Sequence, residues 1–379
     1  MKSYQEINEK IKKGTAVVLT AEEVSKLATE KSAAEIAKTV DVVTTGTFGP
    51  MCSSGMFLNV GHYDPPIRME HITLNGVEVH AGVAAVDMYI GATACNPAKP
   101  TYGGAHIIEE LIAGKDVELI ASGKGTDCYP TQEIKTHINK SKVNEMILFN
   151  PRNAYQNYPV AVNNSGKIKY TYMGSLLPKL GNANYSTSGE LSPLLNDPDL
   201  RTIGIGTRIF LGGTTGYVSW YGTQFKTDVP RTAEGVPTVN AATISVIGNA
   251  KDMSTDFIRA AYYEKYGVSI FIGIGIPIPI LDEEMAKAVM IRNEQIVTKI
   301  VDYGNIDKPV LGEVNYKQLM SGEITLHDKK IKTASMSSLH KARIIADQLK
   351  GQIQSGSFTL TEPVEAFPKN TSLNSLEIR

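Results

Sequence analysis

The sequence predicts an α/β fold with a mixed sheet, because a βαβ unit and short hairpins occur in the same chain. The apolar run 16–19, a helical segment and the β-branched run 40–44 follow one another in the order of a βαβ unit, whose crossover is expected to be right-handed. Asn75-Gly76 lies between two short apolar segments, and this pair favours the type I′ turn of a hairpin. Crossovers and hairpins in one chain are typical of a mixed sheet.

The first part of the chain carries clear local signals. Thr20 and Glu23 form a capping box, which predicts a helix from this point to about Lys38 with a break near Lys31. A glycine-rich loop over 46–55 follows the second strand of the βαβ unit. The further elements expected here are a hairpin over 72–79, a buried strand over 83–90, a helix over 107–113 that ends at Gly114, and a strand over 117–121.

The second part of the chain predicts hairpins, buried strands and amphipathic helices. Asp282 is expected to cap a long helix ending near Gly304, because Met285, Val289 and Ile296 recur at helical spacing. The other expected elements are a hairpin of 159–162 with 167–172, a strand over 243–247, a helix from Ser254 to Gly267, a strand over 268–276, a hairpin of 324–325 with 330–332, a helix over 338–353 and a strand over 357–360.

This pattern suggests one large domain and a smaller appendage. We expect a catalytic domain over residues 1–312, a small C-terminal α+β unit over 313–369, and a disordered tail over 370–379. The formal net charge is −1, which argues against a nucleic-acid-binding surface. The N-terminus lacks the apolar run of a signal peptide, and the longest uncharged apolar stretch, 266–281, is too short to span a membrane. Three cysteines do not suit a secreted disulfide framework, so a cytoplasmic protein is expected.

The three cysteines each follow a predicted strand, in a loop of glycine or other small residues. Free cysteines are often small buried hydrophobic residues, and that interpretation stays open for Cys95. Cys52 lies among Pro, Ser and Gly, and a helix beginning at the following serines would favour its thiolate. Cys128 follows Asp127, whose charge would oppose a thiolate. The chain contains no C-x-x-C, H-E-x-x-H, complete G-x-G-x-x-G or P-loop motif, so we expect neither a bound metal nor a nucleotide cofactor.

Several segments together resemble one enzyme family, the homocysteine biosynthesis, sulfur-incorporation enzymes, which are L-aspartate semialdehyde sulfurtransferases of anaerobes. The resemblance covers about Ile7 to Pro368. It rests on the segments TGTFGPMCSSGMFLN (45–59), GTDCYP (125–130), NPRNAYQNY (150–158), GNANY (181–185), LSPLLNDP (191–198), GIGTRIFLG (204–212) and GIGIPIPILDEE (273–284). The two functional cysteines of the family match Cys52 and Cys128, whereas Cys95 matches no functional position.

The resemblance implies a reaction that joins L-aspartate semialdehyde, a sulfide donor and two electrons into L-homocysteine and water. One thiolate would carry sulfur as a persulfide, and the other would resolve it and leave a disulfide. This chain would then bind no cofactor, and an external reductant, a small ferredoxin-like iron–sulfur protein, would supply the electrons. No nucleic acid or membrane partner is implied, and the oligomeric state stays open, a homo-oligomer included. The alternatives are a thiol–disulfide oxidoreductase and a non-catalytic sulfur carrier in an assembly.

The amino-acid substrate requires a partner for its carboxylate, and a bidentate arginine meets this need best. Arg152 and Arg208 lie within the resembling segments and are the candidates, although each could instead bind backbone carbonyls. Asn153 and Asn182 could add polar contacts to the substrate. Lys124, near Cys128, is a candidate for a Schiff base with the aldehyde. Because the proposed chemistry passes sulfur or electrons between Cys52 and Cys128, we expect both to line one cleft.

Overall fold

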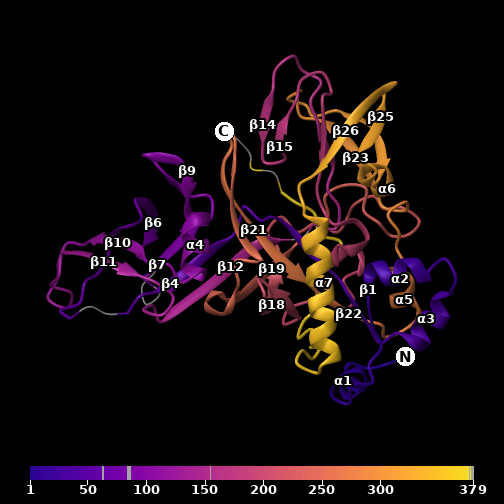
Figure 1. The fold of residues 1–379 in the computed structure, drawn as a ribbon, viewed down its shortest axis with the longest axis horizontal. Helices are drawn as coiled ribbons and strands as arrows, with labels where there is room; N and C mark the ends of the chain where they lie inside the picture. Colours follow the sequence, from indigo (N-terminus) through magenta and orange to yellow (C-terminus); the bar gives the residue numbers. More distant parts are fainter. Residues whose placement is uncertain (62–63, 83–86, 154, 375, 377–379) are drawn as a thin grey trace.

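The structure is a computed structural model and describes residues 1–61, 64–82, 87–153, 155–374 and 376. Helices lie around two large sheets (Figure 1). None of the helices in these ranges combines the length and apolar character that crossing a bilayer requires. The α-helices of the described chain are α1 (Tyr4–Lys12), α2 (Ala21–Leu27), α3 (Ala33–Thr39), α4 (Gly104–Ile112), α5 (Glu283–Val289), α6 (Tyr316–Met320) and α7 (Leu339–Gln354).

A 13-stranded antiparallel sheet forms the largest part of the molecule. It extends from the lobe on the left of Figure 1 to the centre, where α7 covers it. Its strands, in spatial order, are β11 (Glu133–Ile138), β10 (Val117–Ser122), β5 (His71–Leu74), β6 (Val77–Ala81), β7 (Met88–Gly91), β4 (Gly55–Asn59), β12 (Glu145–Asn153), β19 (Ile244–Asn249), β18 (Thr214–Tyr221), β17 (Arg208–Leu211), β21 (Gly267–Gly275) and β20 (Ile258–Tyr263), with β3 (Thr47–Pro50) paired to β21.

A six-stranded sheet lies at the upper right of Figure 1 and contains parallel as well as antiparallel pairs. Its order is β24 (Val310–Asn315), β23 (Val297–Asp302), β13 (Val160–Val162), β16 (Ala183–Tyr185), β26 (Lys329–Ser335) and β25 (Glu323–Leu326). The smaller sheets pair β1 (Val18–Thr20), β2 (Val42–Thr44) and β22 (Pro277–Pro279), then β14 (Lys169–Thr171) with β15 (Gly174–Leu176), and β8 (Cys95–Asn96) with β9 (Lys99–Gly103).

The predicted α/β class with mixed sheets is confirmed, and so is the βαβ unit. Strands β1 and β2 are parallel, and α2 and α3 connect them. The capping box at Thr20 and Glu23 is present, and the helix breaks after Leu27, close to the predicted position. Asn75 and Gly76 both have positive φ and join β5 to β6, as a type I′ hairpin requires.

Four predicted elements are wrong, and in three of them pairing between distant strands decides the structure. The segment after Ser254 is strand β20, paired to β21, rather than a helix. The helix capped by Asp282 ends after Val289, and Val297–Asp302 is strand β23, whose side chains alternate between buried and half-buried. Strand β13 pairs with β16 and β23 instead of forming a hairpin with 167–172. Residues 357–360 form no strand, and 83–86 of the predicted strand 83–90 lie outside the described residues.

The C-terminal segment is closely joined to the rest of the described chain. Strand β26 pairs with β16, and α7 packs on β21 and β3, so elements on both sides of residue 312 share one sheet. The division at residue 312 itself stays a prediction. Within the predicted tail, Thr371 hydrogen-bonds Thr227, whereas residues 375 and 377–379 lie outside the described ranges.

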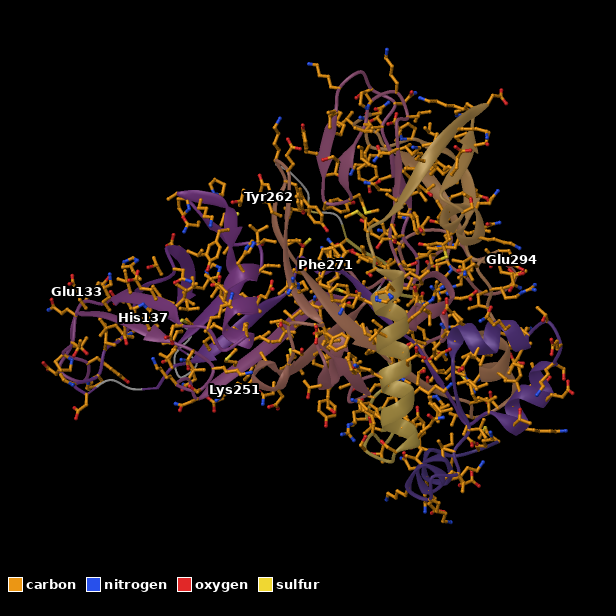
Figure 2. All side chains as sticks on the ribbon, viewed as in Figure 1. Glu133, His137, Lys251, Tyr262, Phe271 and Glu294 are labelled. Atoms are coloured by element: carbon orange, nitrogen blue, oxygen red, sulfur yellow. The ribbon has the colours of Figure 1, made fainter. Side chains whose placement is uncertain are left out.

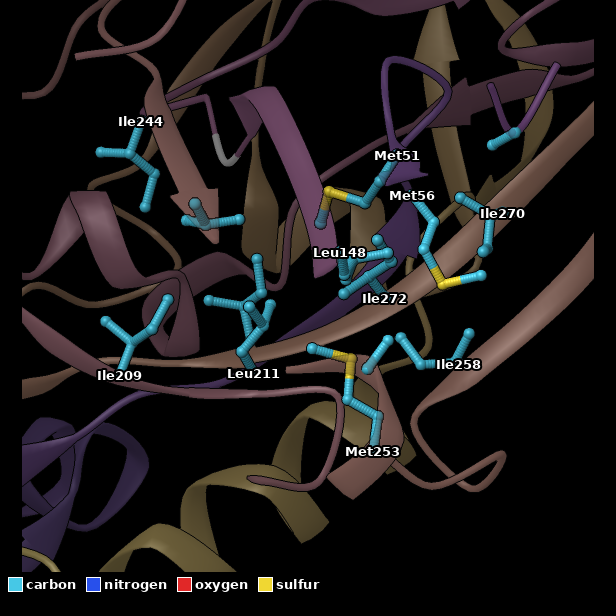
Figure 3. Close-up of a cluster of buried hydrophobic side chains, with 14 of the residues drawn as sticks. Met51, Met56, Leu148, Ile209, Leu211, Ile244, Met253, Ile258, Ile270 and Ile272 are labelled. Atoms are coloured by element: carbon cyan, nitrogen blue, oxygen red, sulfur yellow. The ribbon is translucent and has the colours of Figure 1, made fainter. Parts of the chain in front are cut away.

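Two hydrophobic cores correspond to the two large sheets. The larger core fills the space beneath the 13-stranded sheet, and the second lies beneath the six-stranded sheet around Tyr316. Figure 3 shows Met51 and Met56 pointing into the larger core beside Leu148, Ile270 and Ile272. These two methionines flank the Cys52 loop, so both ends of that loop are anchored by buried side chains.

The close packing of α7 makes Gly46 sensitive to substitution. A Cβ atom at Gly46 would lie 2.1 Å from the carbonyl oxygen of Ala342, a backbone atom of α7. We expect Gly46→Ala to lower the free energy of unfolding by roughly 1–3 kcal/mol, as overpacking of cores does. Urea denaturation measures this change. Gly351→Ala, at an exposed position of α7 with open space around it, is the control and should raise the stability by about 0.5–1 kcal/mol. A Gly46→Ala variant as stable as the wild type would contradict the packing argument.

Candidate active site

Cys52 lies in a tight loop between β3 and β4 that hydrogen bonds hold against the sheet. The Met51 amide donates to the Ile270 carbonyl at 2.7 Å, and the Ser54 amide donates back to the Met51 carbonyl at 3.0 Å. The Ser54 hydroxyl donates to the same carbonyl at 2.7 Å, and the Asn150 side-chain amide donates to that hydroxyl at 2.7 Å. The loop therefore presents the half-buried Cys52 thiol in a defined position.

A pocket of about 450 Å³ opens over this loop. Larger hollows, of about 790 Å³ over β5 and β10 and about 590 Å³ beside α1, contain no cysteine among their lining residues. The pocket at Cys52 is smaller than these two, but a thiol lines it. It is lined by Pro50, Met51, Cys52, Ser53, Arg152, Tyr155, Tyr158, Tyr172, Met173, Ser186, Gln224, Asn240 and Tyr266.

Arg152 is the cation of this pocket. Its backbone amide donates to the Asn150 side-chain oxygen at 2.7 Å, and its guanidinium donates to the side-chain oxygen of Gln224. Within the described ranges it forms no ion pair with an acidic side chain. The guanidinium is therefore available to a carboxylate that enters the pocket.

Four tyrosines, Tyr155, Tyr158, Tyr172 and Tyr266, line the same pocket. The Tyr158 hydroxyl donates to that of Tyr172 at 2.7 Å, and the Tyr172 and Tyr303 hydroxyls are 2.8 Å apart. Tyr155 packs its ring edge-on against Tyr158, and Tyr172 contacts Tyr266 in the same way. Burial raises the pKa of Tyr155, Tyr158 and Tyr266 above the usual value, so these phenols stay protonated and can donate hydrogen bonds at neutral pH.

Cys128 does not lie in this pocket. It is exposed in the loop that joins β10 to β11, and four inter-strand steps of about 4.8 Å, roughly 19 Å in all, separate β10 from β4. Figure 2 shows Glu133, at the end of the Cys128 loop, in the outer left lobe, and Phe271, which pairs with Pro50, at the centre. The expectation that both cysteines line one cleft is therefore wrong for a single chain. In an antiparallel sheet the connecting loops lie at both ends of the strands. Strands β10 and β4 run in the same direction, and the Cys128 loop follows β10 whereas the Cys52 loop precedes β4, so the two loops lie at opposite ends of the strands.

The remaining predicted site residues also lie outside the pocket. Arg208, on β17, stacks on the Phe358 ring at 4.7 Å and donates to the Thr359 hydroxyl at 3.2 Å, so it ties the C-terminal segment to the sheet. Asn182 bonds the backbone of its own turn, at Ser175 and Leu177. Asn153 is buried, and its side-chain amide has no hydrogen-bond partner among the described residues. Lys124 lies in the Cys128 loop, and Cys95 is exposed on β8.

Sequence reasoning missed the tyrosines, Gln224 and Ser269. Tyr155 and Tyr158 belong to the segment NPRNAYQNY, so the spacing of two tyrosines after Arg152 was a usable signal. Gln224, Tyr172 and Tyr266 reach the pocket only through the fold. Ser269, whose hydroxyl lies 3.0 Å from the Cys52 sulfur, is hidden in the apolar sequence of a buried strand.

Comparisons with known proteins point to one family. A family model described as homocysteine biosynthesis enzyme, sulfur-incorporation, matches residues 16–360. An L-aspartate semialdehyde sulfurtransferase of Methanosarcina acetivorans is 47% identical over 379 residues, which cover 99% of this chain and 74% of that protein. A protein of the same name from Methanocaldococcus jannaschii is 50% identical over 385 residues, 97% of this chain and 73% of that one. No solved structure matches the chain. The chain belongs to the homocysteine biosynthesis, sulfur-incorporation family of enzymes.

Proposed function

We propose that this chain is an L-aspartate semialdehyde sulfurtransferase that forms L-homocysteine in the Cys52 pocket. The substrate is that of the two named relatives, each of which matches nearly the whole of this chain. The observation that carries the proposal is the pairing of a half-buried thiol with an arginine in one pocket. The arginine suits the carboxylate of an amino acid, and the thiol suits sulfur transfer to its aldehyde.

In the proposed reaction sulfide attacks a disulfide of Cys52 and Cys128. The S–S bond breaks, Cys52 keeps the incoming sulfur as a persulfide, and Cys128 leaves as a thiolate. Arg152 binds the substrate carboxylate and directs the aldehyde carbon toward the sulfur, while the tyrosine hydroxyls donate hydrogen bonds to polar groups of the substrate. L-Aspartate semialdehyde, hydrogen sulfide, two electrons and two protons balance L-homocysteine and water. A small ferredoxin-like iron–sulfur protein supplies the electrons from outside the chain.

Cys128 is proposed as the thiol that resolves the persulfide. The distance along the sheet prevents a direct contact with Cys52 of the same chain, because a disulfide needs Cα atoms about 4.4–6.8 Å apart. The exposed position of Cys128 leaves it accessible to another copy of the chain. The proposal is therefore that Cys128 of one copy resolves sulfur on Cys52 of a second copy.

The proposed function is tested by an anaerobic assay with L-aspartate semialdehyde, sulfide and a low-potential reductant, read by the mass of homocysteine. Repeated turnover that requires sulfide supports the proposal. Reduction of added disulfides without homocysteine would indicate a thiol–disulfide oxidoreductase instead. Loading of one sulfur per chain without turnover would indicate a sulfur carrier, and either result would overturn the proposal.

The role of Cys128 predicts a covalent dimer. Wild-type protein loaded with sulfide and oxidised mildly should migrate as a disulfide-linked dimer on a non-reducing gel, and Cys52→Ser and Cys128→Ser should each abolish that band. Cys95→Ser, at an exposed cysteine outside the pocket, is the control and should keep it. A linked peptide of Cys52 and Cys128 at the mobility of the monomer would show that a single chain forms the bond.

A further inference from the structure

Two hydroxyl groups from one short segment approach the sulfur of Cys52. The Ser269 hydroxyl lies 3.0 Å from the sulfur, and Tyr266, which lines the pocket beside Cys52, interacts with the same side chain. We propose that both are catalytic residues. Ser269 stabilises the Cys52 sulfur that bears the persulfide, and Tyr266 protonates the aldehyde oxygen when the terminal sulfur adds to the carbonyl carbon. This inference rests on the proposed function and assigns the proton donor at that site.

The position of Ser269 favours a chemical role over a packing role. It is fully buried in β21, between the apolar residues Val268 and Ile270. A buried hydroxyl requires a hydrogen-bond partner, and the sulfur of Cys52 is within reach of this one. The pairing of Phe271 with Pro50 and the bond from the Met51 amide to the Ile270 carbonyl keep the two side chains together. The sheet therefore holds a hydroxyl group against the sulfur.

Tyr266 has the position and the protonation state of a general acid. It lines the pocket together with Cys52 and Arg152, so a substrate whose carboxylate is bound by Arg152 enters beside the phenol. Burial, the neighbouring Cys52 side chain and Tyr172 raise the pKa of Tyr266. The phenol therefore keeps its proton at neutral pH until a stronger base, such as a developing alkoxide, takes it.

The assigned step is an addition without a change of oxidation state. The terminal sulfur of the Cys52 persulfide forms a bond to the aldehyde carbon, and the π electron pair of the carbonyl moves to oxygen. Oxygen takes the phenol proton of Tyr266, and the proton released by the persulfide returns to the phenolate. The product is a hemithioacetal attached to Cys52 through a disulfide bond. The Cys128 thiolate then attacks the Cys52 sulfur, so the Cys52–Cys128 disulfide forms again and the hemithioacetal leaves as a thiol. Loss of water gives a thioaldehyde, and the external reductant of the proposed function supplies the two electrons that, with two protons, reduce it to the thiol of L-homocysteine.

Two matched variants test the inference by activity. Tyr266→Phe removes the proton and keeps the ring, and we expect kcat to fall about 100-fold or more, as for loss of a general acid, with KM for the aldehyde changed less than about twofold because the ring remains. Tyr262→Phe is the control, since Tyr262 is a similarly exposed tyrosine that does not line the pocket. A Tyr266→Phe variant with the kcat of the wild type would overturn the proton-donor role while leaving the proposed function intact.

A second readout does not depend on the reaction. The alkylation rate of Cys52 by iodoacetamide at pH 7, followed on its own peptide by mass spectrometry, should fall about fivefold or more in Ser269→Ala, because a hydroxyl that donates to sulfur favours the reactive anion. Tyr262→Phe should leave this rate unchanged. An unchanged rate in Ser269→Ala would overturn the contact. If the wild-type protein forms no homocysteine, the proposed function and the role of Tyr266 fall together, and this rate still decides the role of Ser269.

Discussion

Replacing Cys52 by serine is expected to lower sulfide-dependent homocysteine formation by about three orders of magnitude or more, the scale seen when a nucleophile is removed from an enzyme. A serine hydroxyl is a much weaker nucleophile at neutral pH and cannot form a persulfide. The anaerobic assay of homocysteine by mass measures the loss, at equal concentrations of folded protein. Serine is close to cysteine in size, and the position is half-buried, so the melting temperature should change little.

The matched control for this variant is Cys95→Ser. Cys95 is exposed on β8, outside the pocket, and its sulfur contacts only the Thr93 carbonyl among the hydrogen-bond partners in the described ranges. Substitutions at exposed positions rarely change the free energy of unfolding by more than about 0.5 kcal/mol, so the Cys95→Ser protein should stay folded. Its activity should therefore lie within about twofold of the wild type. Full activity of a folded Cys52→Ser protein would refute the assignment of the site, since no other cysteine lines this pocket.

Replacing Arg152 by methionine is expected to lower kcat/KM for L-aspartate semialdehyde by roughly 100-fold, because hydrogen bonds to charged groups contribute about 1.5–3 kcal/mol. Methionine retains the length of the side chain and removes the charge. The expected effect lies mainly in KM if the arginine binds the carboxylate equally in the ground state and the transition state. Steady-state kinetics with varied aldehyde at saturating sulfide measures both constants.

Arg208→Met is the control for Arg152→Met. Its guanidinium stacks on Phe358 and donates to Thr215 and Thr359, all outside the pocket. Arg208→Met should therefore reduce stability by about 1–2 kcal/mol through lost hydrogen bonds and leave KM unchanged. The pair of variants separates substrate binding from structural support. A normal KM in Arg152→Met, or a raised KM in a folded Arg208→Met protein, would reverse the two assignments.

The fold could be predicted where the signal is local. The capping box at Thr20 and Glu23, the Asn75-Gly76 turn and the N-cap at Asp282 depend on residues a few positions apart, and all are present. The predicted long helix after Asp282 was wrong in its second half, because Ile296 and Ile300 fit a helical period equally well. The second half is a strand because Val297–Asp302 pairs with β13 and β24, which are distant in the sequence.

The site could be predicted only in part, for a related reason. The loop of Cys52 and the segment of Arg152 carry recognisable residues, and the fold brings the two together. The prediction that Cys128 lies beside Cys52 was based on the expectation that the loops after successive strands gather at one end of the sheet. That holds for a parallel sheet, whereas this sheet is antiparallel. Tyr266 and Ser269 were missed because neither has a motif around it. Their relation to Cys52 arises from the register between β21 and β3.

The pocket lies where the two large sheets meet, and this position gives substrate binding a mechanical consequence. Cys52 and Arg152 belong to the body built on the 13-stranded sheet, whereas Tyr158, Met173 and Ser186 belong to the body built on the six-stranded sheet. A substrate that contacts residues from both sheets links the two sheets and restrains their motion relative to each other. Amide hydrogens on the two sides, at Asn150 and at Ala161, should then exchange more slowly together when the aldehyde or a carboxylate analogue is bound, in proportion to its occupancy.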